Sequence, residues 1–319
     1  MRPFGLRRRK TTVGVDIGSG FSKAAVLEHG ENGPRLKALA TARNEADAVR
    51  GGTIRDPERV ADTLSSMFRR ERIKPRDVVI GIGGRDVLSK VIEIDRMDEA
   101  EARAVMPWEA EQHVPFDMKN VELDFAIIDP DGEGSTMTVL LAAAKRDVVE
   151  TRVALARRAD LNPTTVDVEA LALRNAFEAN HPNAMKDVTV LVDIGAHSTT
   201  MHLLRDGLPL LTRELAIGAP TADELDECAR RIARGITRTG AFVETGPGIA
   251  GVYLCGGGAT AAGLIEVLAE TTGVETRLAS AFERIEVAPD VADRTDLGAV
   301  APLLMLSVGL ALRSPVRGG

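Results

Sequence analysis

Two stretches of sequence decide the fold: VGVDIGSGFSKAAVLEHG at residues 13–30 and VLVDIGAHSTTMHLLRDG at residues 190–207. They align at an offset of 177 residues, and the alignment matches Asp16 with Asp193. Each stretch contains a β-branched strand, an Asp-Ile-Gly turn, a hydroxyl-rich loop, a second apolar strand and a glycine turn. Self-similarity at this distance predicts two lobes built on one design.

Each of these hairpin turns has the chemistry of a phosphate site. Glycine lets the backbone approach an anion closely, and consecutive N–H groups form an anion-binding concavity to which Ser and Thr hydroxyls add donors. An aspartate beside phosphates is repulsive unless a cation lies between them, so Asp16 and Asp193 predict Mg²⁺ held through water. One Asp-Gly turn can simply join two strands, whereas a turn of this kind in each half of the chain favours a ligand.

A third glycine cluster, Gly256 to Gly258, follows an apolar strand at residues 252–254 and precedes a helix expected from about residue 261. Three glycines between a strand and a helix suit the close passage of a flat ligand or a phosphate. A tight turn without any ligand is the alternative interpretation, and the cluster by itself does not decide between them.

Length and composition exclude several classes of protein. The 319 residues, 44% hydrophobic and 27% charged, suffice for about two globular domains and exclude a disordered chain, a collagen-like repeat and a small disulfide scaffold. The net charge of −7 argues against a broad basic surface for nucleic acid. Cys228 and Cys255 lack metal-ligand spacing, so we expect free thiols and no zinc site. The longest uncharged run, residues 297–312, is too short for a membrane span and predicts a buried helix.

Basic residues gather at the N-terminus. Residues 1–10 contain five basic and no acidic side chains, with Phe4 and Leu6 among them. Such a tail could rest on an anionic cytoplasmic leaflet, at about 1 kcal/mol per basic residue near the surface. A frayed, solvated terminus is the alternative.

The region between the two repeats has a mixed α/β pattern. A helix is expected over residues 57–70, because Val60, Leu64 and Phe68 share one face and Asp56 can act as N-cap. Further strands are expected at 78–82, 87–94, 124–128, 137–144 and 164–168, and further helices at 97–112, 147–159 and 169–179. The block from about 86 to 167 therefore has the order β-α-β-β-α-β, which predicts a subdomain inserted in the first lobe.

The two hairpins and the glycine-rich turn, in this order, resemble the actin-like ATPase superfamily, in which two lobes hold a nucleotide between two phosphate hairpins. The block Trp108–Asp117, WEAEQHVPFD, resembles a signature of the PilM family, cytoplasmic proteins of type IV pilus assembly. From the residues alone, Trp108 shares a helix face with Ala104 and Val105 and belongs to no acid/base pair. Further segments that resemble landmarks of this family are Ala143–Lys145, Asp160–Pro163, Asp167–Glu169 and Gly309–Arg313, so the likeness covers nearly the whole chain.

The resemblance implies an actin-like two-lobe α/β fold of the duplicated ribonuclease-H type. Lobe one would comprise residues 11–185 with the inserted subdomain at about 86–167, and lobe two residues 186–319. From Ala219 to Cys255 the chain has only 37 residues, and they contain one amphipathic helix. We therefore expect the second subdomain of lobe two, at about 219–250, to be reduced.

The resemblance also implies a function: a cytoplasmic adaptor, peripheral at the inner membrane, of the type IV pilus or a related secretion platform. It would bind Mg·ATP between its lobes and the N-terminal cytoplasmic peptide of a PilN-like membrane protein, alongside other platform proteins. We expect nucleotide binding with slow hydrolysis at most, and no residue is identified as a catalytic base. The alternatives are an FtsA-like filament-forming ATPase and a small-molecule kinase of the same superfamily.

In the family pattern Lys23 would reach a phosphate, and Gly218 would follow the strands of lobe two. The residues predicted to bind nucleotide are Asp16, Gly18, Ser19, Gly20, Ser22, Lys23, Asp193, Gly195, Ser198, Thr199, Gly218, Gly256, Gly257 and Gly258. Asp16 and Asp193 are also predicted to hold Mg²⁺.

Overall fold

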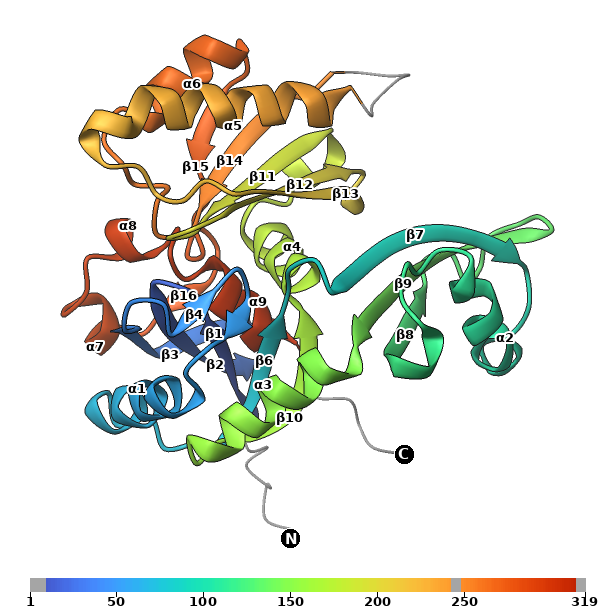
Figure 1. Cartoon of the computed structure of the whole chain (residues 1–319), viewed down its shortest axis with the longest axis horizontal. Coiled ribbons are helices and arrows are strands. Elements are labelled where there is room, and N and C mark those ends of the chain that lie inside the picture. The colour runs from blue at the N-terminus through green and yellow to red at the C-terminus, as the bar shows by residue number, and fades with distance from the viewer. Residues whose placement is uncertain (1–9, 242–247, 314–319) are drawn as a thin grey trace, which may run out of the picture.

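Two sheets with the same strand order form the two lobes (Figure 1). The structure is a computed structural model that describes residues 10–241 and 248–313, so all of the predicted basic tail at residues 1–10 except Lys10 lies outside the described residues. The order is β10-β6-β1-β2-β3-β16 in lobe one and β15-β14-β11-β12-β13 in lobe two. In each lobe three antiparallel strands are followed by two strands parallel to the first. The repeat in the sequence is thus a repeat of topology.

The strands predicted for the two hairpins and for residues 78–82, 164–168 and 252–254 are confirmed within about three residues, whereas the other strands of the two lobes were not predicted. Lobe one contains β1 (Lys10–Ile17), β2 (Phe21–Gly30), β3 (Gly33–Arg43), β6 (Asp77–Ile82), β10 (Asn162–Val168) and β16 (Glu286–Val287), with a short hairpin of β4 (Val49–Arg50) and β5 (Thr53–Ile54). Lobe two contains β11 (Thr189–Ile194), β12 (Thr199–Arg205), β13 (Leu208–Leu215), β14 (Gly251–Cys255) and β15 (Thr276–Leu278). The central strands β1 and β11 are almost entirely buried, which explains their Val- and Ile-rich sequences.

Helices cover both faces of the sheet of lobe one. On one face lie α1 (Pro57–Arg70) and α3 (Arg146–Arg158), and on the other α4 (Glu169–Asn180) and α9 (Met305–Leu312). The predicted helix over residues 57–70 is confirmed as α1: Asp56 accepts a hydrogen bond from the Arg59 amide, and Val60, Leu64 and Phe68 are buried.

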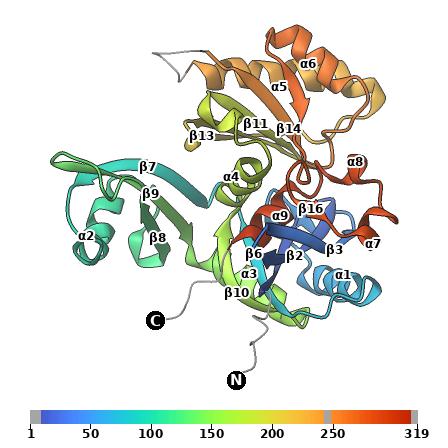
Figure 2. The ribbon, with the colours of Figure 1, turned by 180° about the vertical axis from the view of Figure 1, so that it is seen from behind.

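The helices α4 and α9 lie between the two lobes and join their cores (Figures 1 and 2). Their cluster contains Leu27 of lobe one and Leu191 of lobe two. A Cβ atom on Gly309 would lie 1.8 Å from the Ala172 carbonyl oxygen, so only glycine permits this approach of the two helices. The run 297–312 was predicted as one helix; the structure divides it into α8 (Leu297–Val300) and α9. Pro302 separates them because it has no N–H to continue a helix.

The sheet of lobe two has helices on both faces. Its outer face carries α5 (Leu225–Gly240) and α6 (Leu264–Thr272), packed on β11, β12 and β14, while α4 lies against its inner face, where Phe177 contacts Tyr253 of β14. The short α7 (Pro289–Ala292) packs beside β3 of lobe one. The single helix predicted for residues 219–250 is α5, and it joins β13 to β14 as α1 joins β3 to β6. Cys228 and Cys255 are buried free thiols, as predicted. Across the described residues, no helix combines the length and apolarity needed to cross a bilayer.

A three-stranded sheet extends from lobe one as an arm (Figure 1). It consists of β7 (Val87–Asp95), β8 (Val121–Ile127) and β9 (Thr136–Lys145) in the order β7-β9-β8, covered by α2 (Glu99–Glu111). The prediction that the insertion extends to residue 167 is wrong, because β10 pairs with β6 and α3 packs in the core of lobe one. The alternation of strands and helices along a sequence does not specify which sheet a strand joins.

Candidate functional site

The turn between β1 and β2 is held by one asparagine. The Asn44 side chain donates to the Gly18 carbonyl oxygen over 2.7 Å, and its backbone N–H donates to the Gly20 carbonyl oxygen over 3.0 Å. The buried Ser22 hydroxyl donates to the Asn44 side-chain oxygen over 3.0 Å. The Gly18 N–H donates to Phe21 within the turn. These bonds fix the loop before any ligand binds.

The turn between β11 and β12 is held in the same way by the segment after β13. The Ala219 N–H donates to the Gly195 carbonyl oxygen over 2.8 Å, and the Thr199 hydroxyl donates to Ile217 over 2.8 Å. A Cβ atom on Gly218 would lie 2.0 Å from the Ala196 carbonyl oxygen, so this glycine allows the segment to pass close behind the turn. Both turns therefore have the same construction: the residues that follow the third strand clamp them.

The third glycine cluster lies against the second turn. Gly256 has a φ of +83° and a Cβ there would lie 2.3 Å from the Asp193 carboxylate, while the Gly258 N–H donates to the Ile194 carbonyl oxygen over 2.9 Å. Glycine at 256 and 258 is thus required by packing on the second hairpin. Gly257 has more room: the nearest atom to a Cβ there is 3.5 Å away, on Leu303.

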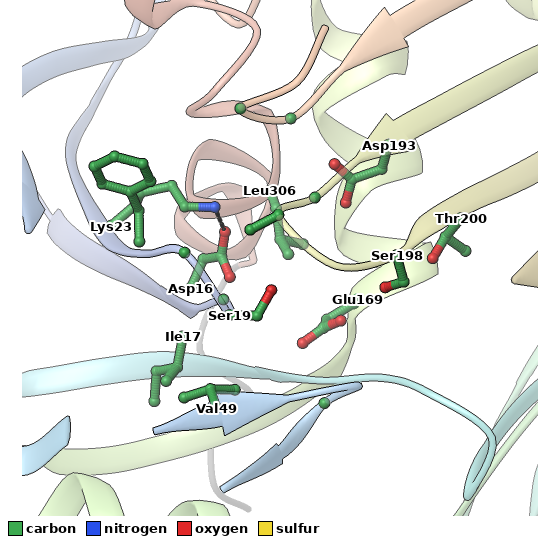
Figure 3. A pocket seen from close by; sticks show the side chains of 18 of the residues that line it. Asp16, Ile17, Ser19, Lys23, Val49, Glu169, Asp193, Ser198, Thr200 and Leu306 are labelled. Atoms are coloured by element: carbon green, nitrogen blue, oxygen red, sulfur yellow. Dashed lines mark hydrogen bonds and ion pairs between the residues drawn. The ribbon is translucent and has the colours of Figure 1, made fainter. Parts of the chain in front are cut away.

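The two turns and the third cluster surround one cavity of about 200 Å³. The turns meet at its edge, where a Cβ on Gly20 would lie 2.9 Å from the Ala196 methyl group. Figure 3 shows Asp16 and Asp193 pointing into the space from opposite lobes. Within the described residues, the backbone N–H groups of Ser19, Gly20, Ala196 and His197 form no hydrogen bond, so both turns offer donors.

Eleven of the fourteen predicted residues line this cavity: Asp16, Gly18, Ser19, Gly20, Lys23, Asp193, Gly195, Ser198, Gly256, Gly257 and Gly258. The other three, Ser22, Thr199 and Gly218, do not line it, and their prediction as ligand contacts is wrong. The hydroxyls of Ser22 and Thr199 are buried and donate to the protein, and Gly218 supports the second turn.

The charges in the cavity are unevenly balanced. Lys23 and Asp16 form an ion pair with both side chains largely buried. Burial alone would lower the pKa of Lys23, but attraction from Asp16, with smaller contributions from Asp193 and Glu169, raises it above its ordinary value. Asp193 forms no ion pair within the described residues; burial, together with repulsion from Asp16 and against attraction from Lys23, raises its pKa to about 6. The cavity therefore has a carboxylate that lacks a cation.

That unbalanced carboxylate fits a hydrated Mg²⁺. Within residues 10–241 and 248–313, no three His, Cys, Asp or Glu side chains gather into a metal cluster. Asp16 and Asp193 supply two carboxylates across the cavity, and Mg²⁺ commonly uses one or two carboxylates while it keeps several water molecules. Burial is the main cause of the raised pKa of Asp193, and a divalent cation between the two carboxylates would offset the added repulsion from Asp16.

Glu169 and Arg152 are lining residues that the sequence did not identify as site residues. Glu169 opens α4 directly after β10 and points into the cavity (Figure 3). Burial raises its pKa to about 7, against the attraction of Arg152. The Arg152 guanidinium, 3% exposed, donates to the carbonyl oxygens of Ile17 and Gly52 over 3.1 and 3.2 Å and lies 4.0 Å from Glu169.

For Glu169, the sequence offered one signal of a role in the site: it directly follows a strand. The carboxyl ends of parallel strands border ligand sites in open α/β sheets. Arg152 lies at a helix position that periodicity assigns to packing, so its sequence context carried no such signal. The remaining lining residues that were not predicted are Ile17, Phe21, Val49, Gly51, Gly52, Ala196, Thr200, Ala219, Leu303 and Leu306.

Known proteins resemble this chain over its whole length. The family described as type IV pilus assembly protein PilM matches residues 14–226 and 225–315. A chain of a solved PilM–PilN type IV pilus biogenesis complex is similar at a TM-score of 0.82 and 26% identity, covering 96% of this chain and 98% of that chain.

Two further solved structures share the fold. They are the ethanolamine utilization protein EutJ of Carboxydothermus hydrogenoformans (TM-score 0.52, 16% identity, 98% of this chain and 92% of that chain) and the cytoplasmic domain of EpsL of Vibrio cholerae, from its type II secretion system (TM-score 0.50, 12% identity, 97% and 99%). Together with the PilM chain they confirm the expected actin-like two-lobe α/β fold.

Proposed function

Because this chain belongs to the PilM family of type IV pilus assembly proteins, we propose that it is an adaptor of the pilus inner-membrane platform. It binds Mg·ATP between its lobes and the N-terminal cytoplasmic peptide of a PilN-like protein, which holds it at the cytoplasmic face of the inner membrane. The partner is inferred from the PilM–PilN complex that this chain resembles. The cavity shared by the two duplicated turns carries the nucleotide part of the proposal.

The triphosphate lies between the two turns in this proposal. The open N–H groups of Ser19, Gly20, Ala196 and His197 donate to its oxygens, and the Lys23 ammonium supplies positive charge. Mg²⁺, held through water by Asp16 and Asp193, neutralises phosphate charge when it is bound. Gly257, where a Cβ atom would be in ordinary contact with Leu303 at 3.5 Å, borders the nucleoside.

Hydrolysis, where it occurs, depends on Glu169. A general base must reach the attacking water with a pKa near the operating pH, and Glu169 lines the cavity with a pKa of about 7. Near neutral pH about half of the Glu169 side chains are ionised and able to accept that proton.

A groove beside the arm is the proposed peptide site. Its volume is about 390 Å³, and its lining residues are Phe116, Asp117, Asn120, Lys145, Arg146, Asp147 and Glu150. It borders β8, an edge strand of the three-stranded sheet, whose backbone can pair with an extended peptide. The Lys145 ammonium lies over the Phe116 ring, 5.3 Å from its centre. The groove therefore offers a peptide an aromatic side chain together with a cation.

Isothermal titration separates the two parts of this proposal. ATP titrated with and without Mg²⁺ tests the cavity. Asp193→Asn should abolish the Mg²⁺-dependent binding, whereas Asp206→Asn, at an exposed turn of the same lobe, should not. Unaltered ATP affinity in Asp193→Asn would show that the cavity is not the site.

A synthetic N-terminal peptide of a PilN-like protein tests the groove. Phe116→Ala should weaken its binding, and Leu210→Ala, which truncates an exposed apolar side chain on β13 of lobe two, serves as the control. No peptide binding, with or without ATP, would refute the adaptor proposal while leaving the nucleotide result intact.

A further inference from the structure

One strip of the solvent-facing side of α2 is largely apolar. Ala104, Pro107, Trp108 and Glu111, spaced i, i+3, i+4 and i+7, share one exposed face, and three of the four are apolar. Trp108 is 74% exposed, while the opposite face of the helix buries Met106 against the arm's sheet. A surface helix ordinarily presents polar residues to solvent, and an exposed tryptophan marks a surface that a partner covers.

The arm that carries this face is strongly acidic. Residues 87–145 contain 13 acidic and 5 basic side chains, a net charge of −8, against −7 for the whole chain. Glu109 and Glu111, next to Trp108 in the sequence and on the same helix, form no ion pair within the described residues. The complementary occupant is therefore a segment that combines positive charge with apolar side chains.

The chain itself contains one such segment. Residues 1–9, MRPFGLRRR, hold four arginines, Phe4 and Leu6 and no acidic side chain. Arginine is suited to this face, because its guanidinium stacks on tryptophan and pairs with carboxylates. Residues 1–9 therefore complement this face of α2 in two respects: their arginines suit its acidic surroundings, and Phe4 and Leu6 suit its apolar side chains.

The segment leads into β1 in lobe one, whereas α2 covers the sheet of the arm, and the two elements lie apart in both views (Figures 1 and 2). We propose that residues 1–9 of one copy dock on the α2 face of the next, with arginines against Trp108 and its neighbouring glutamates. Such a contact is heterologous and repeats from copy to copy.

The full-length chain supplies its own probe, because Trp108 is its one tryptophan. With rising protein concentration, the Trp108 emission maximum should move to shorter wavelength and the sedimentation coefficient should increase. The triple variant Arg7→Ser, Arg8→Ser, Arg9→Ser should lose both changes, and high salt should weaken them.

Sedimentation of two single variants tests the surface itself. Trp108→Ala should weaken the association about thirtyfold, the effect of losing a central aromatic contact. Leu210→Ala, which truncates another exposed apolar side chain on β13, is the matched control and should associate normally. Because both side chains are exposed, neither variant is expected to unfold.

Three outcomes would overturn the proposal. Association that Trp108→Ala leaves unchanged would remove α2 from the contact. An emission shift that does not depend on concentration would show that the tail docks on its own copy. If the arginine variant loses binding to anionic phospholipid vesicles but still self-associates, the tail serves a membrane surface instead.

Discussion

Asp16 and Asp193 occupy equivalent positions in the two repeats, yet their replacement by asparagine should change the stability of the ligand-free protein in opposite directions. Asp16 is paired with Lys23 in a largely buried position. Asp193 forms no ion pair within the described residues, and its pKa rises to about 6 because it is buried. Asp16→Asn leaves the Lys23 ammonium without its ion-pair partner. Asp193→Asn removes a buried negative charge that has no such partner among the described residues.

The magnitude follows from the pKa of Asp193. An ordinary aspartate ionises near 3.8 and Asp193 near 6, so ionised Asp193 opposes folding by roughly 3 kcal/mol, at 1.36 kcal/mol per pH unit. Because the folded pKa is the higher one, the folded state binds more protons between about pH 4 and pH 6, and stability falls as the pH rises through that window. At pH 8, the free energy of unfolding of Asp193→Asn should therefore exceed that of wild type by up to about 3 kcal/mol.

Asp16→Asn should lower the unfolding free energy by about 3 kcal/mol or more, because breaking a buried ion pair leaves the Lys23 ammonium without its partner. Urea unfolding of ligand-free protein, followed by far-ultraviolet circular dichroism at pH 8 and again near pH 4, measures both effects. The gain in Asp193→Asn should vanish near pH 4, and Asp206→Asn is the control. If both variants shift the midpoint in the same direction at pH 8, the unequal charge balance of the cavity is refuted.

Three further predictions concern Glu169, Arg152 and Gly309. Glu169→Gln should abolish ATP hydrolysis without loss of ATP affinity, and wild-type phosphate release should rise with pH through about 7; release from the variant would exclude Glu169 as the base. Arg152→Met should move that pH profile to higher pH, because Arg152 lowers the pKa of Glu169, and Arg152→Lys should restore it in part; an unmoved profile would contradict this role. Gly309→Ala should destabilise the fold by about 3 kcal/mol or more in thermal unfolding, because its methyl group would lie 1.8 Å from the Ala172 oxygen, whereas exposed Gly298→Ala should be tolerated.

The sequence alone determined the elements that depend on local patterns. The helix α1 follows from its apolar spacing, its Asp56 cap and Pro57 in the first turn, all within one segment. The two hairpins follow from alternation and turn glycines, and the duplication follows because the same local pattern occurs twice. Within each hairpin, a turn that joins two adjacent strands places its own residues together, which is why the predicted residues of the two turns cluster; bringing both turns and Gly256–Gly258 around one cavity required the tertiary fold.

Only the tertiary structure decided which of these residues face a ligand and what surrounds them. Ser22 and Thr199 belong to the predicted turns, yet their hydroxyls point to partners more than fifteen positions away in the sequence. Arg152 reaches Ile17 across 135 positions, β10 joins β6 and not the arm, and Trp108 stays exposed although its helix packs on the sheet of the arm. Periodicity and turn chemistry act over a few residues, whereas burial, ion pairing and sheet membership depend on contacts between distant segments that form only when the chain packs.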